Sequence, residues 1–406
     1  MRASRTQLPS LWLLAFMMSV GAFGDTEYTP AMPAIAQALH TPYNMVQLSM
    51  AAYLVSLSVS QLFFGPISDR YGRRPTMLAG AVILAGGALA CAWSNSIWPL
   101  IGGRFIQGIG ACAGGVIASA CVRDVFPADE RQAIYAKLNA AFAVAPAVGP
   151  MVGTYVASAL GWRANFLVLT IVSGALLLTT WRWLPETLAK RVDPFSQPTR
   201  VLGAMRRVAA TPGFLFFALL GGLCLGMAYT ALIDAPDLVI NVLGMGGGGI
   251  VVIAIVILVA VVIGDSLCAF LSPRINPWII VGAALLVLVT GSALLFIVAA
   301  RMNGHIDFVL YLAPIALCFV GVGLCLPVTT AKAMAPFGDR AGTASSLLGF
   351  VRMGVAALAT LVMSVIHRGS AFDMPIMFLG LSVAGALMFA TYRLAGTRHR
   401  GHDVDT

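Results

Sequence analysis

Long runs of apolar residues recur along the whole chain. Each run has about 20 residues, the length that crosses a bilayer as a helix, and short polar or Gly/Pro-bearing breaks separate the runs. The pattern predicts twelve transmembrane helices. Their expected spans are 11–36, 47–67, 75–94, 99–121, 134–160, 165–184, 213–240, 247–271, 278–300, 308–331, 343–366 and 374–395. The first span is too long, and too polar beyond its middle, for a cleaved signal peptide, so we expect it to remain as a helix.

Composition agrees with an all-α membrane protein. Of the 406 residues, 59% are hydrophobic and only 10% are charged, and the mean hydropathy is +0.90. The longest polar connection, 185–212, separates six spans from six. We therefore predict a six-helix bundle over 1–184, a cytoplasmic connecting loop over 185–212 and a second six-helix bundle over 213–406. Such a division favours a solute site between two repeats near the midplane.

The basic residues predict the orientation, since Lys and Arg are enriched in cytoplasmic loops. If both termini are cytoplasmic, only Arg163, Arg301 and Arg368 of the 25 basic residues lie outside, and Arg104 and Arg352 lie within spans. This topology also accounts for the net charge of +9, so we expect no nucleic-acid partner. The predicted location is a bacterial inner membrane, with the lipid bilayer as a partner and a monomer as the expected state.

Cysteine and histidine give no sign of a metal site or cofactor, and we predict neither. The seven cysteines fall in or at the edge of apolar spans without metal-ligand spacing, and they are typical of small core residues. His40, His305 and His367 lie near predicted outer ends, and His399 and His402 lie in the tail, so we expect all five to be solvated. The chain also has no G-x-x-x-x-G-K-[ST] motif, which leaves an ion gradient as the expected energy source.

The loop between spans 2 and 3 carries the first recognisable motif, GPISDRYGRRPTML (65–78). It resembles the G-x-x-x-D-R-x-G-R-R signature of the major facilitator superfamily, and its charged residues are Asp69, Arg70, Arg73 and Arg74. The resemblance implies that Asp69 holds the two bundles together on the cytoplasmic side. Physically, Asp69 could face the free amides at the start of span 11, in GTASS (342–346). The alternative for each of these residues is an ordinary charge in an inside loop.

Two further stretches extend the resemblance. Asp124, just after span 4, resembles the acidic partner of the loop arginines. Within span 4, LIGGRFIQGIGACAGG (100–115) resembles the family's R-x-x-Q-G signature, whose arginine is associated with proton coupling. A charge at the centre of a span costs about 2.5–3.5 kcal/mol on insertion scales, so Arg104 should face a polar cavity or a partner. Alternatively, Arg104 lies close enough to the outer end to snorkel to water.

Span 5 contains APAVGPMVGTY (145–155), which places Gly149, Pro150 and Gly153 in a helix interior. Proline encourages a bend, and glycines four apart form a face on which a helix can pivot against its neighbour. The stretch is similar to the G-x-x-x-G-P-x-x-G-G signature of proton-driven antiporters, although Ala145 and Thr154 replace its first and last glycines. The alternative is a kinked packing helix.

Span 1 carries two carboxylates, Asp25 and Glu27, in GDTEYTPAMP. At about 1.5 Å per residue they lie about 20–24 Å from the inner end, beyond the midplane but within the hydrocarbon zone. A buried carboxyl group is more stable protonated, whereas a nearby Arg104 favours the ionised form, and this opposition suits proton coupling. The resembling family has an Asp four residues before the proline, where this chain has Thr26. We favour Glu27 over Asp25 because its longer side chain can reach a cavity.

Other polar or aromatic residues within spans are candidates for contact with a solute. Asp234 either faces the outer water or contributes to a substrate or proton site. Arg352 stands where similar transporters usually have an uncharged residue, so it either favours an anionic solute or pairs with Asp265. Together with Glu27, the predicted substrate-binding residues are Tyr53, Phe142, Tyr229, Asp234, Phe350 and Arg352.

The motifs lie mainly in residues 20–155 and look most like the twelve-span Bcr/CflA type of drug:proton antiporter, which includes chloramphenicol and siderophore exporters. The second half matches by topology and fragments only. The resemblance implies no enzymatic activity but a proton-coupled exporter of a small amphipathic compound, such as an amphenicol or bicyclomycin-like drug or a siderophore. The alternatives are a proton-coupled metabolite importer and, in a different class, a membrane receptor or sensor that transports nothing.

Overall fold

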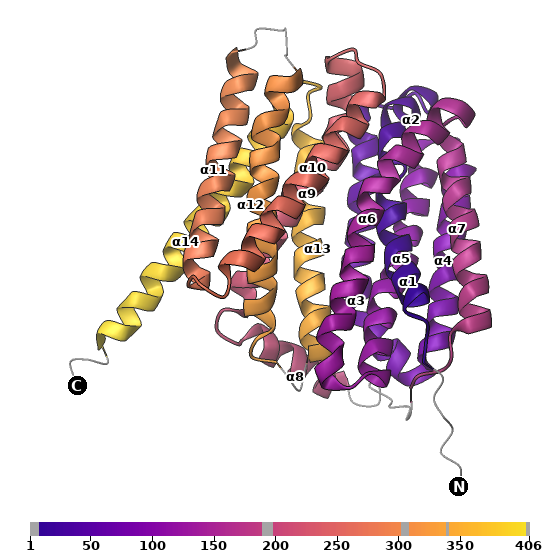
Figure 1. Cartoon of the computed structure of the whole chain (residues 1–406). Coiled ribbons are helices and arrows are strands. Elements are labelled where there is room, and N and C mark those ends of the chain that lie inside the picture. Colours follow the sequence, from indigo (N-terminus) through magenta and orange to yellow (C-terminus); the bar gives the residue numbers. More distant parts are fainter. Residues whose placement is uncertain (1–7, 189–197, 302–307, 338–340, 403–406) are drawn as a thin grey trace. The chain divides into compact units, whose positions relative to one another are not determined.

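The structure is a computed structural model that describes residues 8–188, 198–301, 308–337 and 341–402, and every regular element in these ranges is helical (Figure 1). The first half contains α1 Leu11–Thr26, the 3₁₀ turn η1 Thr29–Ala31, α2 Met32–Ala38, α3 Tyr43–Tyr71, α4 Arg73–Ala92, α5 Ile97–Val125, α6 Ala128–Leu160 and α7 Trp162–Trp183. The second half contains α8 Pro198–Ala209, α9 Phe214–Asp237, the π-turn η3 Leu238–Val242, α10 Gly248–Leu271, α11 Pro277–Arg301, α12 Phe308–Met334, α13 Ala341–Ile366 and α14 Asp373–His402.

Eleven helices of the described chain are long and apolar enough to cross a membrane, and they correspond to the predicted spans 2 to 12. The first predicted span is the exception. Instead of one helix over 11–36, α1 ends at Thr26 and the chain continues through η1 into the seven-residue α2. The continuous helix predicted there is wrong, although the segment is still helical on both sides of the break.

Proline explains the break in span 1. In an α-helix, the N–H group of residue 30 would donate to the carbonyl oxygen of residue 26. Pro30 has no N–H group, so this hydrogen bond cannot form. The Thr29 hydroxyl donates to that carbonyl oxygen instead, at 2.9 Å. Ala31 then donates to Tyr28, which makes the tighter 3₁₀ turn. Glu27 therefore lies at the point where the regular helix ends.

The connection between the two halves also differs from the predicted loop over 185–212. Residues 198–209 form the helix α8, which begins with proline at its first position, where the missing amide donor costs nothing. Val208 of α8 is buried, whereas Leu202 is 69% exposed. The connection thus contains a short helix, which its polar composition did not predict.

The helices group into two compact units. Unit 1 comprises Met1–Val208 with Arg340–Ala357, and unit 2 comprises Ala209–Asp339 with Leu358–Thr406. The start of α13 belongs to unit 1, where the Ser58 hydroxyl of α3 donates to the Phe350 carbonyl at 2.8 Å. The bundle boundaries at 184 and 213 stay a prediction.

The same helix pairings occur inside both units. In unit 1, α4 packs on α5 and α7, while α3 and α1 pack on α5. In unit 2, the equivalent pairs are α11 with α12 and α14, and α10 and α9 with α12. Each helix in the unit 2 pairs lies six spans after its counterpart in the unit 1 pairs. The two units are therefore structural repeats of each other.

Candidate functional site

Glu27 is fully buried within unit 1. Its side chain is 0% exposed, and neither carboxyl oxygen has a hydrogen-bond partner among the described residues. Its backbone is well held: the amide donates to Phe23 at 3.0 Å, and the carbonyl oxygen accepts from Asn165 of α7 at 3.2 Å. A buried carboxyl group without partners is costly, so its presence in a firmly held backbone suggests a functional site.

The glycines of α6 pack directly against this part of span 1. A methyl group added at Gly153 would overlap the carbonyl oxygen of Glu27, and one added at Gly149 would overlap the side chain of Thr26. Asn165 also donates to the carbonyl oxygen of Gly153, at 3.3 Å. The glycines of the antiporter-like motif therefore allow α6 to approach the backbone at the candidate proton-coupling acid.

Arg104 is fully buried in α5, so the alternative in which it snorkels to the outer water is wrong. Its guanidinium donates to the carbonyl oxygen of Gly24 at 3.0 Å and to the side-chain oxygen of Gln107. It also lies over the rings of Tyr28 and Tyr53, 4.0 and 4.3 Å from their centroids. Aromatic faces and neutral acceptors can hold a desolvated cation without consuming a carboxylate.

No ion pair joins Arg104 to Glu27 within the described chain. Glu27 is therefore buried in the same unit as a cation but is not bonded to it. A group in this situation can gain or lose a proton without breaking a salt bridge. The role of Asp25, which is 5% exposed, stays a prediction.

Two buried polar residues of unit 1, Asn165 and Gln47, escaped the sequence analysis, whereas Gln107 is the glutamine of the R-x-x-Q-G motif. Gln107, Asn165 and Gln47 are all fully or almost fully buried, and both amide atoms of the Gln47 side chain lack hydrogen-bond partners among the described residues. Gln107 follows Arg104 by one helical turn, a spacing that could have signalled the contact. Tyr53, predicted as a substrate aromatic, is 0% exposed and donates through its hydroxyl to Gly21 at 3.1 Å, so here it packs Arg104.

The charged motif between α3 and α4 is centred on Arg73. Its guanidinium pairs with Asp69 at 2.6 Å and with Asp124 of α5 at 2.8 Å, and it also donates to the Ser68 hydroxyl. Its backbone amide donates to Glu186, which follows α7, at 2.9 Å. Arg73 thus joins segments from three parts of unit 1, and Glu186 is a member that the sequence motif did not reveal.

The other residues of the motif have more local contacts. Arg74 donates to the carbonyl oxygen of Trp181, and Arg70 lies over the ring of Tyr71. The side chain of Asp69 is 44% exposed. The start of α13 comes close to α3, since a methyl group at Gly65 would lie 3.7 Å from the Ser346 hydroxyl. The interaction of Asp69 with amides at 342–346 stays a prediction.

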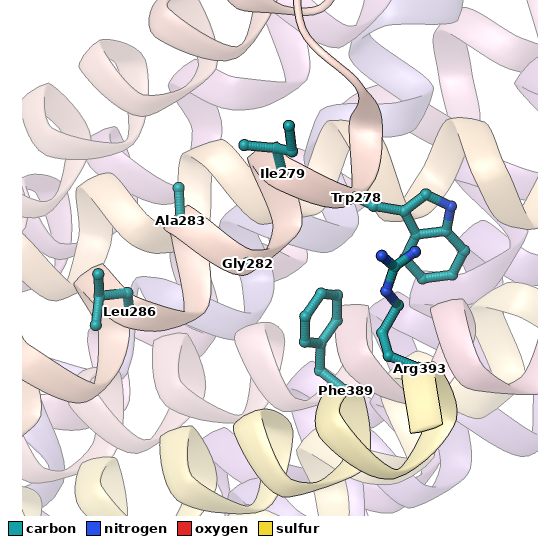
Figure 2. A pocket seen from close by; sticks show the side chains of 7 residues that line it. All are labelled: Trp278, Ile279, Gly282, Ala283, Leu286, Phe389 and Arg393. Carbon is teal, nitrogen blue, oxygen red and sulfur yellow. The ribbon is translucent and has the colours of Figure 1, made fainter. Parts of the chain in front are cut away.

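The remaining residues that were candidates for contact with a solute differ in solvent exposure. Phe142 is 40% exposed, Asp265 is exposed, and Tyr229, Phe350 and Arg352 are half-buried. Their roles, and the pairing of Arg352 with Asp265, stay predictions. None of them lines the groove of about 360 Å³ between α11 and α14. Figure 2 shows Arg393 between Trp278 and Phe389, with the apolar side chains of Ile279, Ala283 and Leu286 along α11.

Unit 2 holds a second buried charged group, and here two expectations are wrong. His367 was expected to be solvated, and outer water was one alternative for Asp234, yet their side chains are only 7% and 4% exposed. The His367 ring lies 3.2–3.4 Å from oxygens of Asp234, Asp237 and Asp373. Burial alone would lower the pKa of His367, but the carboxylates of Asp234 and Asp373 raise it to about 9. The predicted substrate role of Asp234 stays a prediction.

The seven cysteines are all buried and unbonded to one another, as predicted. The presence of a buried acid and a buried arginine among helices long and apolar enough to cross a membrane is typical of membrane transport proteins.

Comparison with known proteins gives the family. Residues 11–360 match the family model described as Major Facilitator Superfamily. The chain is 31% identical to "Multidrug resistance protein D" of Escherichia coli (strain K12), over 86% of this chain and 87% of that protein. It is 30% identical to "Chloramphenicol resistance protein" of Pseudomonas aeruginosa, over 95% and 91%. The chain belongs to the major facilitator superfamily.

Solved structures agree on the fold. A "POT family transporter in complex with 5-aminolevulinic acid" has a TM-score of 0.74 at 12% identity, with 95% of each chain covered. A "D-xylose-proton symporter" has a TM-score of 0.73 at 14% identity, covering 93% of this chain and 96% of that one. The predicted fold class is confirmed, and so is the resemblance to Bcr/CflA-type transporters. The protein is a multi-pass membrane transporter of small molecules and not an enzyme.

Proposed function

We propose that this chain exports a small amphipathic organic compound across the bacterial inner membrane in exchange for protons. Both termini lie in the cytoplasm, the working unit is a monomer, and transport proceeds by alternating access of the two six-helix bundles. The observation that carries the proposal is Glu27, a fully buried carboxyl group with no hydrogen-bond partner among the described residues, held where α1 ends.

In this proposal Glu27 takes up a proton from the outer side and releases it inside. Arg104 favours the ionised form of Glu27 without a direct salt bridge, because its guanidinium is already held by Gly24, Gln107 and two tyrosine rings. Protonation removes the negative charge of Glu27 and hence weakens its capacity to accept hydrogen bonds from a cargo. The proton and the cargo thus compete for one buried acid.

Movement of span 1 would be transmitted through α6. Gly149 and Gly153 bring α6 against the side chain of Thr26 and the backbone of Glu27, and Asn165 donates to a carbonyl oxygen of each segment. Arg73, with Asp69, Asp124, Arg70 and Arg74, serves as the cytoplasmic switch. Pro150 belongs with Gly149 and Gly153 in the moving part of α6. A change at Glu27 therefore reaches α6 without any long flexible connection.

The cargo class follows from the relatives and from one residue. Proteins named for multidrug, chloramphenicol and bicyclomycin resistance support a drug-like compound. Arg352 in α13 adds a cation, and a guanidinium fork favours paired oxygens, which suits an anionic cargo such as a siderophore. Arg352→Gln should then weaken export of anionic cargo at least tenfold more than export of a neutral drug, as measured by competition in vesicles.

Vesicle transport tests the proposal. Inside-out vesicles with an acidic interior should accumulate radiolabelled chloramphenicol, and Glu27→Gln should abolish this accumulation while the protein still binds the neutral drug, since glutamine resembles a permanently protonated acid. Asp25→Asn, two residues away, is the matched control and should retain transport.

Other outcomes identify the alternatives. Accumulation only in right-side-out vesicles would indicate an importer, and ligand binding without accumulation in either orientation would indicate a receptor. If drug-induced proton release survives in Glu27→Gln but disappears in Asp25→Asn, the coupling acid has been assigned to the wrong residue.

A further inference from the structure

Unit 2 gathers three carboxylates around one imidazole near the end of α9 and the turn that precedes α14. Asp234 and Asp237 come from α9, His367 follows α13, and Asp373 begins α14. Each carboxylate residue is at most 4% exposed. Even with a protonated imidazole, three ionised carboxylates leave a surplus of negative charge in a poorly solvated place, and a further cation would neutralise this surplus.

The distances at His367 are those of neighbouring metal ligands. Its Nδ1 lies 3.4 Å from Asp234 Oδ1 and 3.2 Å from Asp373 Oδ2, and one ligand atom from each of the three residues lies within 4.8 Å of the others. Charge-assisted hydrogen bonds are shorter, about 2.7–2.9 Å. In a tetrahedral zinc site with metal–ligand bonds of about 2.0–2.1 Å, neighbouring ligand atoms are about 3.3 Å apart.

The surrounding contacts are those that orient metal ligands. The second ring nitrogen of His367, Nε2, lies 3.4 Å from Asp237 Oδ2. The other oxygen of Asp237 accepts from Asn241 at 2.6 Å, which fixes that carboxylate. A histidine that binds a metal through one nitrogen usually directs the other to a carboxylate or carbonyl group, so Asp237 has the position of an outer partner.

Asp373 is held just as firmly by the turn before α14. Its Oδ2 accepts from the backbone amides of Arg368, at 2.8 Å, and Ser370, at 3.2 Å, and its Oδ1 accepts from the Ser370 hydroxyl at 2.7 Å. These bonds fix the carboxylate in place beside His367. The carboxylate of Asp373 is thereby held in one orientation before any ion binds.

We propose that Asp234, His367 and Asp373 bind a divalent metal ion of the zinc class. One imidazole nitrogen and two carboxylate oxygens are a donor set that zinc accepts, and a water molecule can complete the four ligands. The ion would tie the end of α9 to the turn between α13 and α14 and neutralise the surplus of carboxylates. This site is independent of the proposed export function, because all its residues lie in unit 2.

Metal titration of the full-length protein tests the proposal. The purification tag is removed, and His399→Ala and His402→Ala are introduced in every sample so that the tail histidines cannot contribute. We expect one Zn²⁺ per chain and a zinc-dependent rise in melting temperature. Asp234→Asn and His367→Gln should each weaken Zn²⁺ binding at least tenfold, and Asp237→Asn should weaken it less. Asp265→Asn, a carboxylate of unit 2 outside the cluster, is the control and should bind as the parent does.

A second experiment measures a signal that appears on metal binding, so that unfolding of a variant cannot be mistaken for the expected result. Asp234→Cys should give a near-ultraviolet thiolate-to-metal charge-transfer band with Co²⁺, whereas Asp265→Cys should not. The absence of stoichiometric Zn²⁺ binding by the folded parent, or equal binding by Asp234→Asn, would overturn the proposal. The cluster would then be an ion network closed by a proton on His367.

Discussion

In unit 1 a buried arginine is surrounded by aromatic rings and neutral oxygen atoms, whereas in unit 2 a buried histidine is surrounded by carboxylates. Arg104 lies over Tyr28 and Tyr53 and donates to Gly24 and Gln107. His367, in contrast, has acidic oxygens within 3.4 Å of both ring nitrogens. The same repeated helix pairing therefore supports two different ways of stabilising buried charge.

The two units differ in which buried groups are still able to bind a ligand. In unit 1 neutral oxygens and tyrosine rings hold the guanidinium without Glu27, so the acid keeps its full capacity to bind a proton or a cargo. In unit 2 the acids outnumber the imidazole and are held by backbone amides and an asparagine. A site poised to change its charge requires an unbonded acid, whereas a rigid acid-rich cluster is suited to holding a cation permanently.

The largest effect is expected from Arg104→Met, which keeps much of the side-chain volume but removes the cation. The carbonyl of Gly24 and the amide oxygen of Gln107 would lose their donor, at about 1–3 kcal/mol each. Proton-driven chloramphenicol uptake into inside-out vesicles should fall at least a hundredfold. Arg163→Met, at an exposed arginine that lies over Trp162, should leave uptake unchanged. Normal uptake by Arg104→Met would remove Arg104 from the mechanism.

Asp373→Asn distinguishes a bonded acid from an unbonded one. The asparagine oxygen can still accept from the amides of Arg368 and Ser370, but the negative charge that strengthens these bonds and faces His367 is lost, so the protein should lose about 1–3 kcal/mol of stability. Glu27→Gln breaks no side-chain hydrogen bond among the described residues and should unfold at nearly the parental temperature. Thermal unfolding in detergent with a metal chelator present measures both. Equal melting temperatures for the two variants would contradict the contrast between the units.

The contact between α6 and Glu27 can be tested with two glycines of opposite surroundings. Gly153→Ala inserts a methyl group against the Glu27 carbonyl oxygen and should cost about 1–3 kcal/mol, with a loss of transport. Gly174→Ala in α7 meets nothing within 4 Å and should stabilise its helix by about 0.5–1 kcal/mol. Melting temperatures should therefore move in opposite directions. A stable, active Gly153→Ala variant would show that α6 does not depend on this close approach.

The smallest effect is expected from Asp69→Asn. Its half-exposed pair with Arg73 is worth about 0.3–0.5 kcal/mol, so labelling of the nearby buried Cys121 by a maleimide applied from the cytoplasmic side should rise only about twofold. Asp124→Asn, whose side chain is 19% exposed, should raise labelling further. Unchanged labelling in both variants would reduce this motif to a determinant of topology.

Sequence patterns predicted the membrane class, the later eleven spans and the family, because hydrophobic length and the arginine-rich loop motif are local features. They failed at span 1, where Pro30 removes one hydrogen bond in the second half of the predicted helix. They failed again at His367, since a histidine at the end of a span has no local signal that carboxylates from α9 and α14 will surround it.

The sequence by itself determined which segments cross the membrane and that charged residues occur within them, since the cost of placing polar groups in lipid acts on each segment separately. Tertiary structure decided which charges have partners. Only packing places Gly153 against Glu27, the tyrosine rings against Arg104 and Asp237 against His367, because these contacts join residues from different helices. The energy of a buried charge depends on such neighbours within a few ångströms, and so the candidate sites become apparent only in the folded chain.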